Sequence, residues 1–283
     1  MSQKRVAAIH DISGFGKCSL TVALPIISAA GVETSVIPTA VLSTHTGGFT
    51  GFTYRDLTKD LLDFAQHWSS LDLHFDAIYS GFLGSFEQID IVSKIFDMLK
   101  SQDTLVVVDP CMADNGELYK IYSEEMVGGM AKLCSKADLI VPNITEACMI
   151  LGEKYKVGPY SKDYIETILR KLGNIGCNKV VLTGVFFDED NLGAACYDKV
   201  NNTVDYALAP RIDGYYHGTG DVFASALVAG IMRELDTKSA MQIAVNFTQA
   251  SILRTKNAGT DIRFGVNFEE ELPSLIKNIN GNI

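Results

Sequence analysis

Basic residues are scarce in this sequence of 283 residues, and their scarcity excludes one class of partner. There are 24 Lys and Arg against 34 Asp and Glu, so the formal net charge is −10. No run of Lys and Arg offsets this charge. We expect no nucleic-acid partner, because an acidic surface repels a polyphosphate backbone. Any phosphate must therefore be held locally, by main-chain amides and a metal.

Paired cysteine motifs and long apolar runs are also missing. None of the six cysteines forms a Cys-x-x-Cys pair, and the spacing of cysteines and the five histidines offers no zinc site. The chain is too long to need disulfides, so we expect reduced thiols in a cytoplasmic protein. No run reaches the length of a membrane span, and the apolar stretch before His10 is too short for a signal peptide. With no linker-like segment, we expect one domain over 1–283.

What the sequence does contain is an alternation of short β-rich runs with runs of helical period. Strands are expected at 6–10, 33–42, 76–82, 104–110, 138–143 and 179–184, with a hairpin at 194–210. Helices are expected at 17–30, 56–70, 86–100, 219–234, 237–255 and 268–279. Pro25 would kink or shorten the first of these helices. This order predicts an α/β fold, a three-layer α/β/α sandwich with a mostly parallel central sheet.

Ligands of such sheets bind beyond the carboxyl ends of the strands. That rule directs attention to the residues that follow each strand. They are 11–16, 43–48, 81–84, 109–114, 143–146 and 183–184, together with the loop before 219.

The first loop, 10–20, looks like a nucleotide-binding loop but matches neither common pattern. A P-loop needs a Ser or Thr hydroxyl after Gly-Lys, and here Gly16-Lys17 is followed by Cys18. A dinucleotide fingerprint needs a third glycine where Ser19 stands. A simple glycine turn is favoured, and a dinucleotide-dependent oxidoreductase that uses Gly14 and Gly16 stays open as the alternative.

Within that loop, Asp11 and Ser13 would lie at the ligand edge of the sheet and could face a small polar substrate. His10 ends the first strand, and we expect it to be hydrogen-bonded in the interior rather than catalytic. In the next loop, His45 is expected to cap or support its own segment.

A better phosphate site lies late in the chain, at Gly218-Thr219-Gly220. The glycines allow the amides to turn inward, and the apolar helix that follows presents free N–H groups and a positive dipole end. Asp221 stands in its first turn. It either favours the helix, with Thr219 as cap, or acts as a general base. The residues alone leave both alternatives open.

Two further loops bring carboxylates to the same edge. Asp109 and Asp114 follow one buried strand, and Asn143 and Glu146 follow another. Asn143 and Glu146 have the spacing of a capping pair. Three acidic loops at one sheet edge can also hold Mg²⁺ through water, and ATP phosphates need that metal.

Together these motifs resemble the ribokinase superfamily, through Gly-Thr-Gly-Asp with an apolar helix behind it and Asn-x-x-Glu upstream. Four stretches resemble the pyridoxal kinases within it. They are STHTGGFTGFT (43–53), SGFLGSFEQ (80–88), DPCMADNGELY (109–119) and GTGDVFASAL (218–227). The resemblance implies a ribokinase-like fold and ATP-dependent phosphorylation of the 5′-hydroxymethyl group of pyridoxal, pyridoxamine or pyridoxine.

The resemblance also implies roles at the phosphate end of the site. Asp221 would be the base, and the amides of Gly218, Thr219 and Gly220 would form the anion hole. Glu146 would organise the Mg²⁺ hydration shell, with Asp109 beside the metal. The predicted ATP-binding residues are Asp109, Asn143, Glu146, Thr183, Gly184, Gly218 and Gly220.

At the ring end of the site, the predicted substrate-binding residues are Asp11, Ser13, Thr46, Gly47, Phe82 and Asp221. The sequence departs from the family pattern where Asp11 replaces Ser, Phe82 replaces Tyr and Thr183 replaces Lys. Asp11 would favour a cationic amine. Members of the family often use a monovalent cation such as K⁺ and are usually homodimers, so both are expected here.

Two rivals remain besides the oxidoreductase. A hydroxymethylpyrimidine kinase would share the fold and the chemistry on a similar flat ring. A non-enzymatic carrier of pyridoxal phosphate would not need the Asp221 carboxylate.

Overall fold

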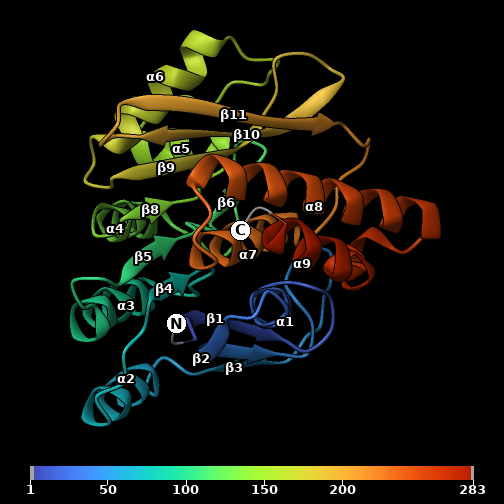
Figure 1. The fold of residues 1–283 in the computed structure, drawn as a ribbon. Coiled ribbons are helices and arrows are strands. Elements are labelled where there is room, and N and C mark those ends of the chain that lie inside the picture. Colours follow the sequence, from blue (N-terminus) through green and yellow to red (C-terminus); the bar gives the residue numbers. More distant parts are fainter. Residues whose placement is uncertain (1–2, 282–283) are drawn as a thin grey trace.

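The computed structural model describes residues 3–281. A nine-stranded sheet runs through the molecule in the order β11-β10-β9-β8-β5-β4-β1-β2-β3 (Figure 1). The six strands from β9 to β2 are parallel, while β3 at one edge and β10 and β11 at the other are antiparallel. The sheet consists of β1 (Arg5–Ser13), β2 (Glu33–Leu42), β3 (Tyr54–Asp56), β4 (Ala77–Ser80), β5 (Leu105–Val108), β8 (Leu139–Ile140), β9 (Lys179–Val185), β10 (Asn191–Asp198) and β11 (Thr203–Pro210).

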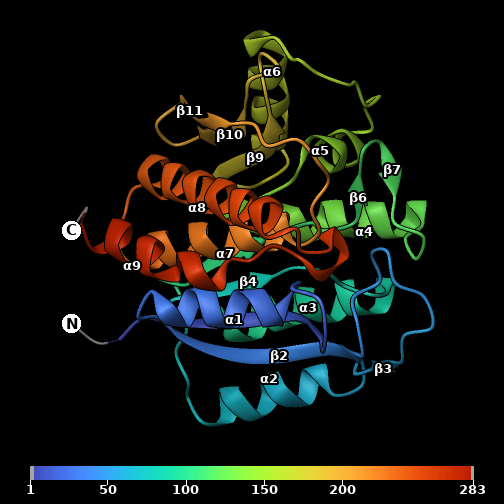
Figure 2. The same ribbon diagram turned by 90° about the vertical axis from the view of Figure 1, so that its right-hand side faces the viewer.

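Helices cover both faces of this sheet (Figure 2). One layer is α2 (Leu61–Ser70), α3 (Phe86–Leu99), α4 (Glu124–Ser135), α5 (Ile144–Leu151) and α6 (Lys162–Gly173). The other layer is α1 (Leu20–Ala29), α7 (Thr219–Met232), α8 (Thr237–Ala258) and α9 (Leu272–Asn280). Two short strands and two 3-10 turns complete the described elements: β6 (Ala113–Asp114) pairs with β7 (Glu117–Leu118), and η1 (Ile262–Phe264) and η2 (Glu269–Glu271) precede α9. The predicted three-layer sandwich is confirmed.

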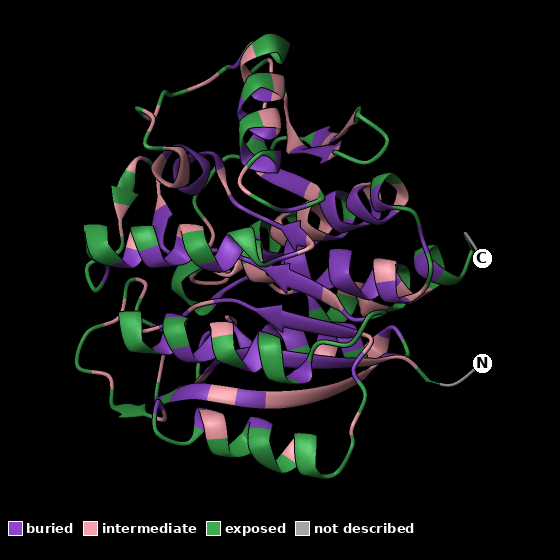
Figure 3. Cartoon of the chain, turned by 90° about the vertical axis from the view of Figure 1, so that its left-hand side faces the viewer, coloured by how far each residue is buried: buried purple, intermediate pink, exposed green. Residues whose placement is uncertain are grey.

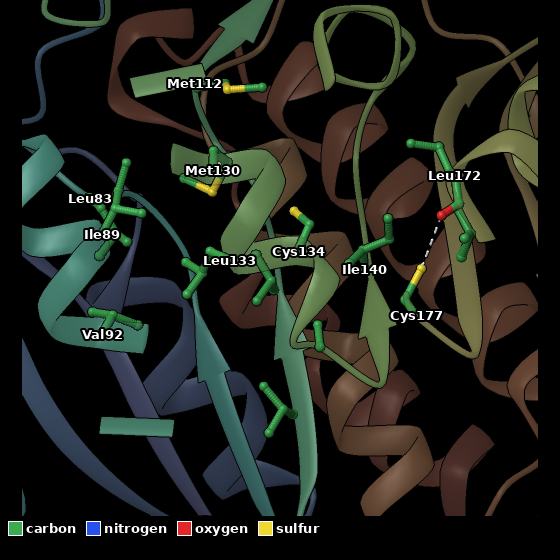
Figure 4. Packing of buried hydrophobic residues seen from close by; sticks show 14 of the residues in the cluster. Leu83, Ile89, Val92, Met112, Met130, Leu133, Cys134, Ile140, Leu172 and Cys177 are labelled. Atoms are coloured by element: carbon green, nitrogen blue, oxygen red, sulfur yellow. Dashed lines mark hydrogen bonds between the residues drawn. The ribbon is translucent and has the colours of Figure 1, made fainter. Parts of the chain in front are cut away.

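The central strands are apolar throughout because both of their faces are covered. In β5, Val106 and Val108 pack against the first helix layer while Val107 packs against the second. Figure 3 shows this buried sheet between helices whose outer faces are exposed. Figure 4 shows the first layer's core, where Met130 and Cys134 of α4 lie among branched side chains and the Cys177 thiol donates to the Leu172 carbonyl at 3.4 Å.

Helix α7 differs from the others because nearly all of its residues are buried, from Val222 to Gly230. It lies between the sheet and the neighbouring α1 and α8. A helix that is apolar all round belongs inside a protein. Packing on every side therefore fixes the helix from Val222 onward and with it the position of the first turn, which matters for the site described below.

Several predicted boundaries are wrong for local reasons. The predicted helix at 56–70 begins only at Leu61, because Tyr54–Asp56 pairs with β2 as an edge strand. The predicted strand at 138–143 is reduced to Leu139–Ile140, close to Pro142, which has no N–H for the ladder. Helix α1 starts at Leu20 and continues through Pro25.

Helices α4, α5 and α6 lie in the part of the chain to which the sequence analysis assigns no helix. The six cysteines are unpaired thiols, as expected. Over residues 3–281, no helix has the length and apolar character needed to cross a membrane.

Candidate active site

The carboxyl ends of the parallel strands bring the predicted acidic loops together with the start of α7. Asp11 lies near the end of β1, Asp109 follows β5, and Glu146 follows β8 in the first turn of α5. Asp11 lies close enough to Asp221 to raise its pKa, and Asp221 and Glu146 lie close enough to Asp109 to raise the pKa of Asp109. Four carboxylates from distant parts of the chain therefore share one site.

The anion-binding turn has the geometry that its glycines suggest. Gly218 is the N-cap of α7 and adopts a left-handed conformation with φ 75°. A Cβ there would lie 2.0 Å from the Lys17 carbonyl oxygen, so the turn rests directly on the first loop. At Gly220 a Cβ would meet nothing within 4 Å, so this side of the turn is open.

The expectation that Thr219 caps the helix is wrong. Thr219 is the first helical residue, and its hydroxyl donates to the Tyr216 carbonyl at 3.3 Å. No side chain of residues 3–281 caps the N-terminus of α7. Its first N–H groups and the positive end of its dipole are thus available to an anion.

Asp221 is only half-buried, while the residues after it in α7 are buried. Burial of the carboxylate and the nearby charge of Asp11 raise its pKa to about 7, although the main-chain N–H of Ser19 donates to it and opposes the shift. A carboxylate with such a pKa can accept a proton near neutral pH. Its placement beside uncapped amides favours the base over the purely structural alternative.

Asp11 is more enclosed than predicted, at 4% exposed. Its two oxygens accept hydrogen bonds from the hydroxyls of Ser19 at 2.6 Å and Ser13 at 3.0 Å. Burial raises its pKa in spite of these two bonds. Asp11 therefore orders the first loop and contributes charge to the site, and Ser13 is held beside it.

Ser19 is a site residue that the sequence analysis did not assign. It has a left-handed backbone with φ 54°, although it is not glycine. Its hydroxyl binds Asp11 and its amide binds Asp221, so it joins the two carboxylates. Only the position of the first loop relative to the start of α7 would have identified this role. From sequence, a serine before a helix usually indicates a cap.

Asp109 is buried, and within residues 3–281 its carboxylate accepts no hydrogen bond. Burial and the charges of Glu146 and Asp221 raise its pKa well above the ordinary value. Like charges held together without a cation make a site that a divalent metal would stabilise. Among the described residues, no three His, Cys, Asp or Glu side chains converge as a complete metal site. A metal would therefore complete its shell with water and ligand oxygens, as Mg²⁺ commonly does.

Glu146 forms the predicted capping pair with Asn143. The Asn143 side chain accepts from the Glu146 N–H at 2.9 Å, and the Glu146 carboxylate accepts from the Asn143 N–H at 2.8 Å and the Met112 N–H at 3.0 Å. Burial nevertheless raises its pKa to about 8. Since amides hold its oxygens, Glu146 fits the role of a fixed charge behind the metal's water better than that of a direct ligand. Capping and functional placement coexist in this residue.

The loop that follows β2 (43–53), which we call the ring-side loop, is held by His45. This histidine supports its own segment, as expected. Its Nδ1 accepts from the Gly47 N–H at 3.1 Å, and its Nε2 lies 2.6 Å from the Arg263 carbonyl oxygen. This pair of partners fixes a neutral ring with its proton on Nε2. Burial lowers its pKa, in agreement with the neutral form. Thr46, between them, is exposed and free to face a ligand.

A segment near the C-terminus, 262–269, closes over these loops, and we call it the C-terminal clasp. The Lys17 N–H donates to the Phe264 carbonyl at 3.0 Å, beside the His45–Arg263 bond. The Phe264 ring meets the Phe15 ring edge-on, with centroids 5.0 Å apart.

The Lys17 side chain also forms hydrogen bonds with the C-terminal clasp. Its ammonium group donates to Asn267 and to Glu269, each at 2.9 Å. In this arrangement Lys17 does not act as the lysine of a P-loop, which agrees with the reading of the first loop as a glycine turn.

The remaining predicted residues lie at the rim of the site. Phe82 is half-buried, with its ring 6.0 Å from that of Tyr122. Thr183 bridges to Asn143 between β9 and α5, and Gly184 after it is exposed with φ 75°. Both therefore lie beside the α5 side of the acidic cluster.

His217 is a second residue that the sequence analysis did not assign. It precedes Gly218, and its ring lies 5.2 Å from that of His45. A Cβ at Gly47 would lie 2.7 Å from it, so the His-Thr-Gly loop and the Gly-Thr-Gly turn are in contact. The loop that carries His45 and the anion turn thus lie side by side.

Comparison with known proteins relates the chain to kinases. The family model described as phosphomethylpyrimidine kinase matches residues 23–265. A Bacteroides thetaiotaomicron structure, provisionally described as a phosphomethylpyrimidine kinase and solved with pyridoxal, is 37% identical, with a TM-score of 0.92 over 97% of this chain and 96% of that one. The structure of a pyridoxal kinase from Lactobacillus plantarum is 30% identical, with a TM-score of 0.89 over 99% of both chains. A pyridoxal kinase of Dictyostelium discoideum is 28% identical over 82% of this chain and 80% of that protein.

The geometry of the anion turn predicts the effect of adding one methyl group. We expect Gly218→Ala to lower the free energy of unfolding by at least about 1 kcal/mol, because φ is positive and the Cβ meets the Lys17 carbonyl. Gly220→Ala is the matched control and should leave the stability within about 0.5 kcal/mol. Urea unfolding of both variants measures the difference, and equal stabilities would contradict the packing described here.

Proposed function

The chain belongs to the phosphomethylpyrimidine kinase family, and we propose that it is an ATP-dependent kinase of vitamin B6 vitamers. It transfers a phosphoryl group to the 5′-hydroxymethyl group of pyridoxal, pyridoxamine or pyridoxine. One observation carries this function: the uncapped N-terminus of α7 lies beside the Asp221 carboxylate, in contact with the ring-side loop. The likeness to a structure that contains pyridoxal and to pyridoxal kinases supports the choice of substrate.

The catalytic step follows from the positions of the anion turn and the base. Asp221 accepts the proton of the substrate hydroxyl as the oxygen attacks the γ-phosphorus of ATP in line, while the bond from that phosphorus to the β–γ bridging oxygen breaks and ADP leaves. The amides of Gly218, Thr219 and Gly220 hold the charge that develops on the transferring phosphoryl group. Because these amides and Asp221 belong to one buried helix, the acceptor and the donor are aligned by a rigid element.

The acidic cluster serves the metal and the nucleotide. Asp109 would bind the Mg²⁺–water complex, and Glu146 would orient its water from behind. Bound Mg²⁺ would supply charge neutralisation for the ATP phosphates. Asn143, Thr183 and Gly184 line the same end and would contact the phosphates. A K⁺ requirement remains a prediction.

The vitamer ring would lie between the first loop and the ring-side loop. Thr46 and Gly47 present polar groups toward it, Phe82 offers a flat wall, and Asp11 with Ser13 forms the floor. The phenyl ring of Phe82 cannot donate a hydrogen bond as a tyrosine would, so recognition of the substrate ring depends more on the other loop groups. Homodimer formation and a cytoplasmic location remain predictions.

The alternatives differ in their support. A hydroxymethylpyrimidine kinase fits the family description and the same chemistry, and a panel of the three vitamers and hydroxymethylpyrimidine with Mg-ATP distinguishes it by catalytic efficiency. The oxidoreductase alternative loses support, because Lys17 binds the clasp and Gly16 packs on His45, where a Cβ would lie 2.2 Å from the ring. The non-enzymatic carrier alternative gives no reason for an uncapped helix beside a carboxylate.

Replacement of the base tests the mechanism. We expect Asp221→Asn to lower kcat by about a hundredfold or more, because the variant loses the proton acceptor while its shape is retained. ATP binding, measured by calorimetry, should remain detectable. A variant with wild-type kcat would remove Asp221 from the role of base.

The raised pKa of Asp221 predicts the acidic limb of the pH profile. The base works only when ionised, so kcat/KM should fall as the pH is lowered through about 7, the folded-state pKa of Asp221. The profile should be recorded at constant ionic strength with a substrate whose own titration is known. Activity that is flat down to pH 5 would show that another group sets the protonation state.

Asp11 predicts a preference among vitamers. Its carboxylate adds negative charge next to the ring site, which should favour the cationic amine of pyridoxamine over the aldehyde of pyridoxal. We expect Asp11→Ser to lower the ratio of kcat/KM for pyridoxamine to kcat/KM for pyridoxal by about threefold or more. An unchanged ratio would show that Asp11 acts on the loop alone.

A further inference from the structure

Three buried polar side chains behind the catalytic carboxylate lack partners. His10 of β1, Tyr79 of β4 and Ser225 of α7 are each 0% exposed. Both ring nitrogens of His10 and the hydroxyl oxygens of the other two find no hydrogen-bond partner among residues 3–281. His10 is in the interior as expected, but none of the described residues is the hydrogen-bond partner expected for it.

These side chains lie together rather than scattered through the core. The His10 and Tyr79 rings meet edge to face, with centroids 4.4 Å apart. The Ser225 hydroxyl lies close enough to that of Tyr79 to lower the Tyr79 pKa as a hydrogen-bond donor does, although the pair does not meet hydrogen-bond geometry. On the other side of His10, a Cβ at Gly81 would lie 2.3 Å from Nδ1, so a glycine is needed to make room for the imidazole.

The group lies directly behind the reacting end of the site. The Tyr79 hydroxyl is close enough to Asp109 and Asp221 to be affected by their charges. Ser225 follows Asp221 by four residues, one turn along the same face of α7. A hydrogen bond made by the Tyr79 or Ser225 hydroxyl therefore affects the position of the first two turns of α7, the helix that carries Asp221.

Unpaired buried polar atoms are costly, and proteins resolve them with internal water. A water needs two to four polar partners, and this group offers two hydroxyls and an imidazole that is neutral, since burial lowers the pKa of His10 to about 3. Three apolar side chains of the same size would pack at these positions without needing a hydrogen-bond partner.

We propose that His10, Tyr79 and Ser225 enclose an ordered water, and that through it Tyr79 is a positioning residue that fixes the start of α7 behind Asp221. The water accepts from one hydroxyl and donates to the other or to the imidazole. This links β1 and β4 to the helix at the level of the base. The kinetic consequence rests on the proposed function, whereas the water itself does not.

The sign of a stability change tests the water. If the site holds water, Tyr79→Phe and Ser225→Ala each break a hydrogen bond and should lower the melting temperature by about 2–4 °C. If the site is dry, both variants remove an unpaired hydroxyl and should raise it. A crystal structure of the unaltered protein that resolves internal waters gives an independent reading: density within hydrogen-bond distance of at least two of the three side chains supports the proposal, and none overturns it.

Kinetics test the positioning role. We expect Tyr79→Phe to lower kcat for pyridoxal phosphorylation about tenfold while both KM values stay within about twofold, because the geometry of the base matters in the transition state. His10→Gln, which keeps a donor and an acceptor, should retain kcat within about twofold, whereas His10→Leu should not.

Remote variants provide the controls. Tyr197→Phe removes a hydroxyl that bonds Asn202 at the opposite end of the sheet, and Ser251→Ala removes one that bonds the Phe247 carbonyl in α8. Both should keep wild-type kcat. An unchanged kcat in Tyr79→Phe would overturn the positioning role. If the unaltered protein fails to phosphorylate any vitamer, the proposed function falls, while melting temperatures and density still decide whether the water is present.

Discussion

The site depends on the repulsion among carboxylates held together at low dielectric. Asp11, Asp109, Glu146 and Asp221 come from four segments, and burial raises the pKa values of all four; repulsion by the other carboxylates of this group adds to the shifts of Asp109 and Asp221. No basic side chain contributes to the shifts of Asp109 and Asp221; the nearest lysine in the first loop, Lys17, is bound to the clasp. Such an arrangement is unfavourable for stability alone and is reasonable where a cation and a polyphosphate complete the charge balance.

The rest of the fold holds these charges in place. Main-chain amides donate hydrogen bonds to Glu146, and the hydroxyls of Ser13 and Ser19 donate to Asp11. The burial of α7 from Val222 onward fixes the position of Asp221. Only Asp109 keeps its carboxylate without a hydrogen bond from the described residues. The division is chemically sensible: three carboxylates are oriented by the protein, and the fourth is left for the incoming ion.

The parts of the fold and of the site that depend on local sequence patterns could be predicted from the sequence. The parts that depend on contacts between distant residues could not. The order of strands and helices and the layer arrangement follow from local periodicity, and the carboxyl-edge rule then gathers Asp11, Asp109 and Glu146. The uncapped N-terminus of α7 and the surroundings of the His10 side chain could not be predicted. They depend on the left-handed turn at Gly218, on Ser19 and on contacts across the sheet, none of which leaves a local pattern. Short helices such as α5 and the glycine-containing α4 were likewise weak signals.

The C-terminal clasp ties the order of synthesis to the maturation of the pocket. His45 and the first loop reach their final partners only through the carbonyls of Arg263 and Phe264, more than 200 residues later in the chain. While the ribosome still holds that segment, the nascent chain can form its early strands but cannot close the ring-binding loops. The side of the site formed by the first loop and the His45 loop is therefore completed only after nearly the whole chain has been synthesised.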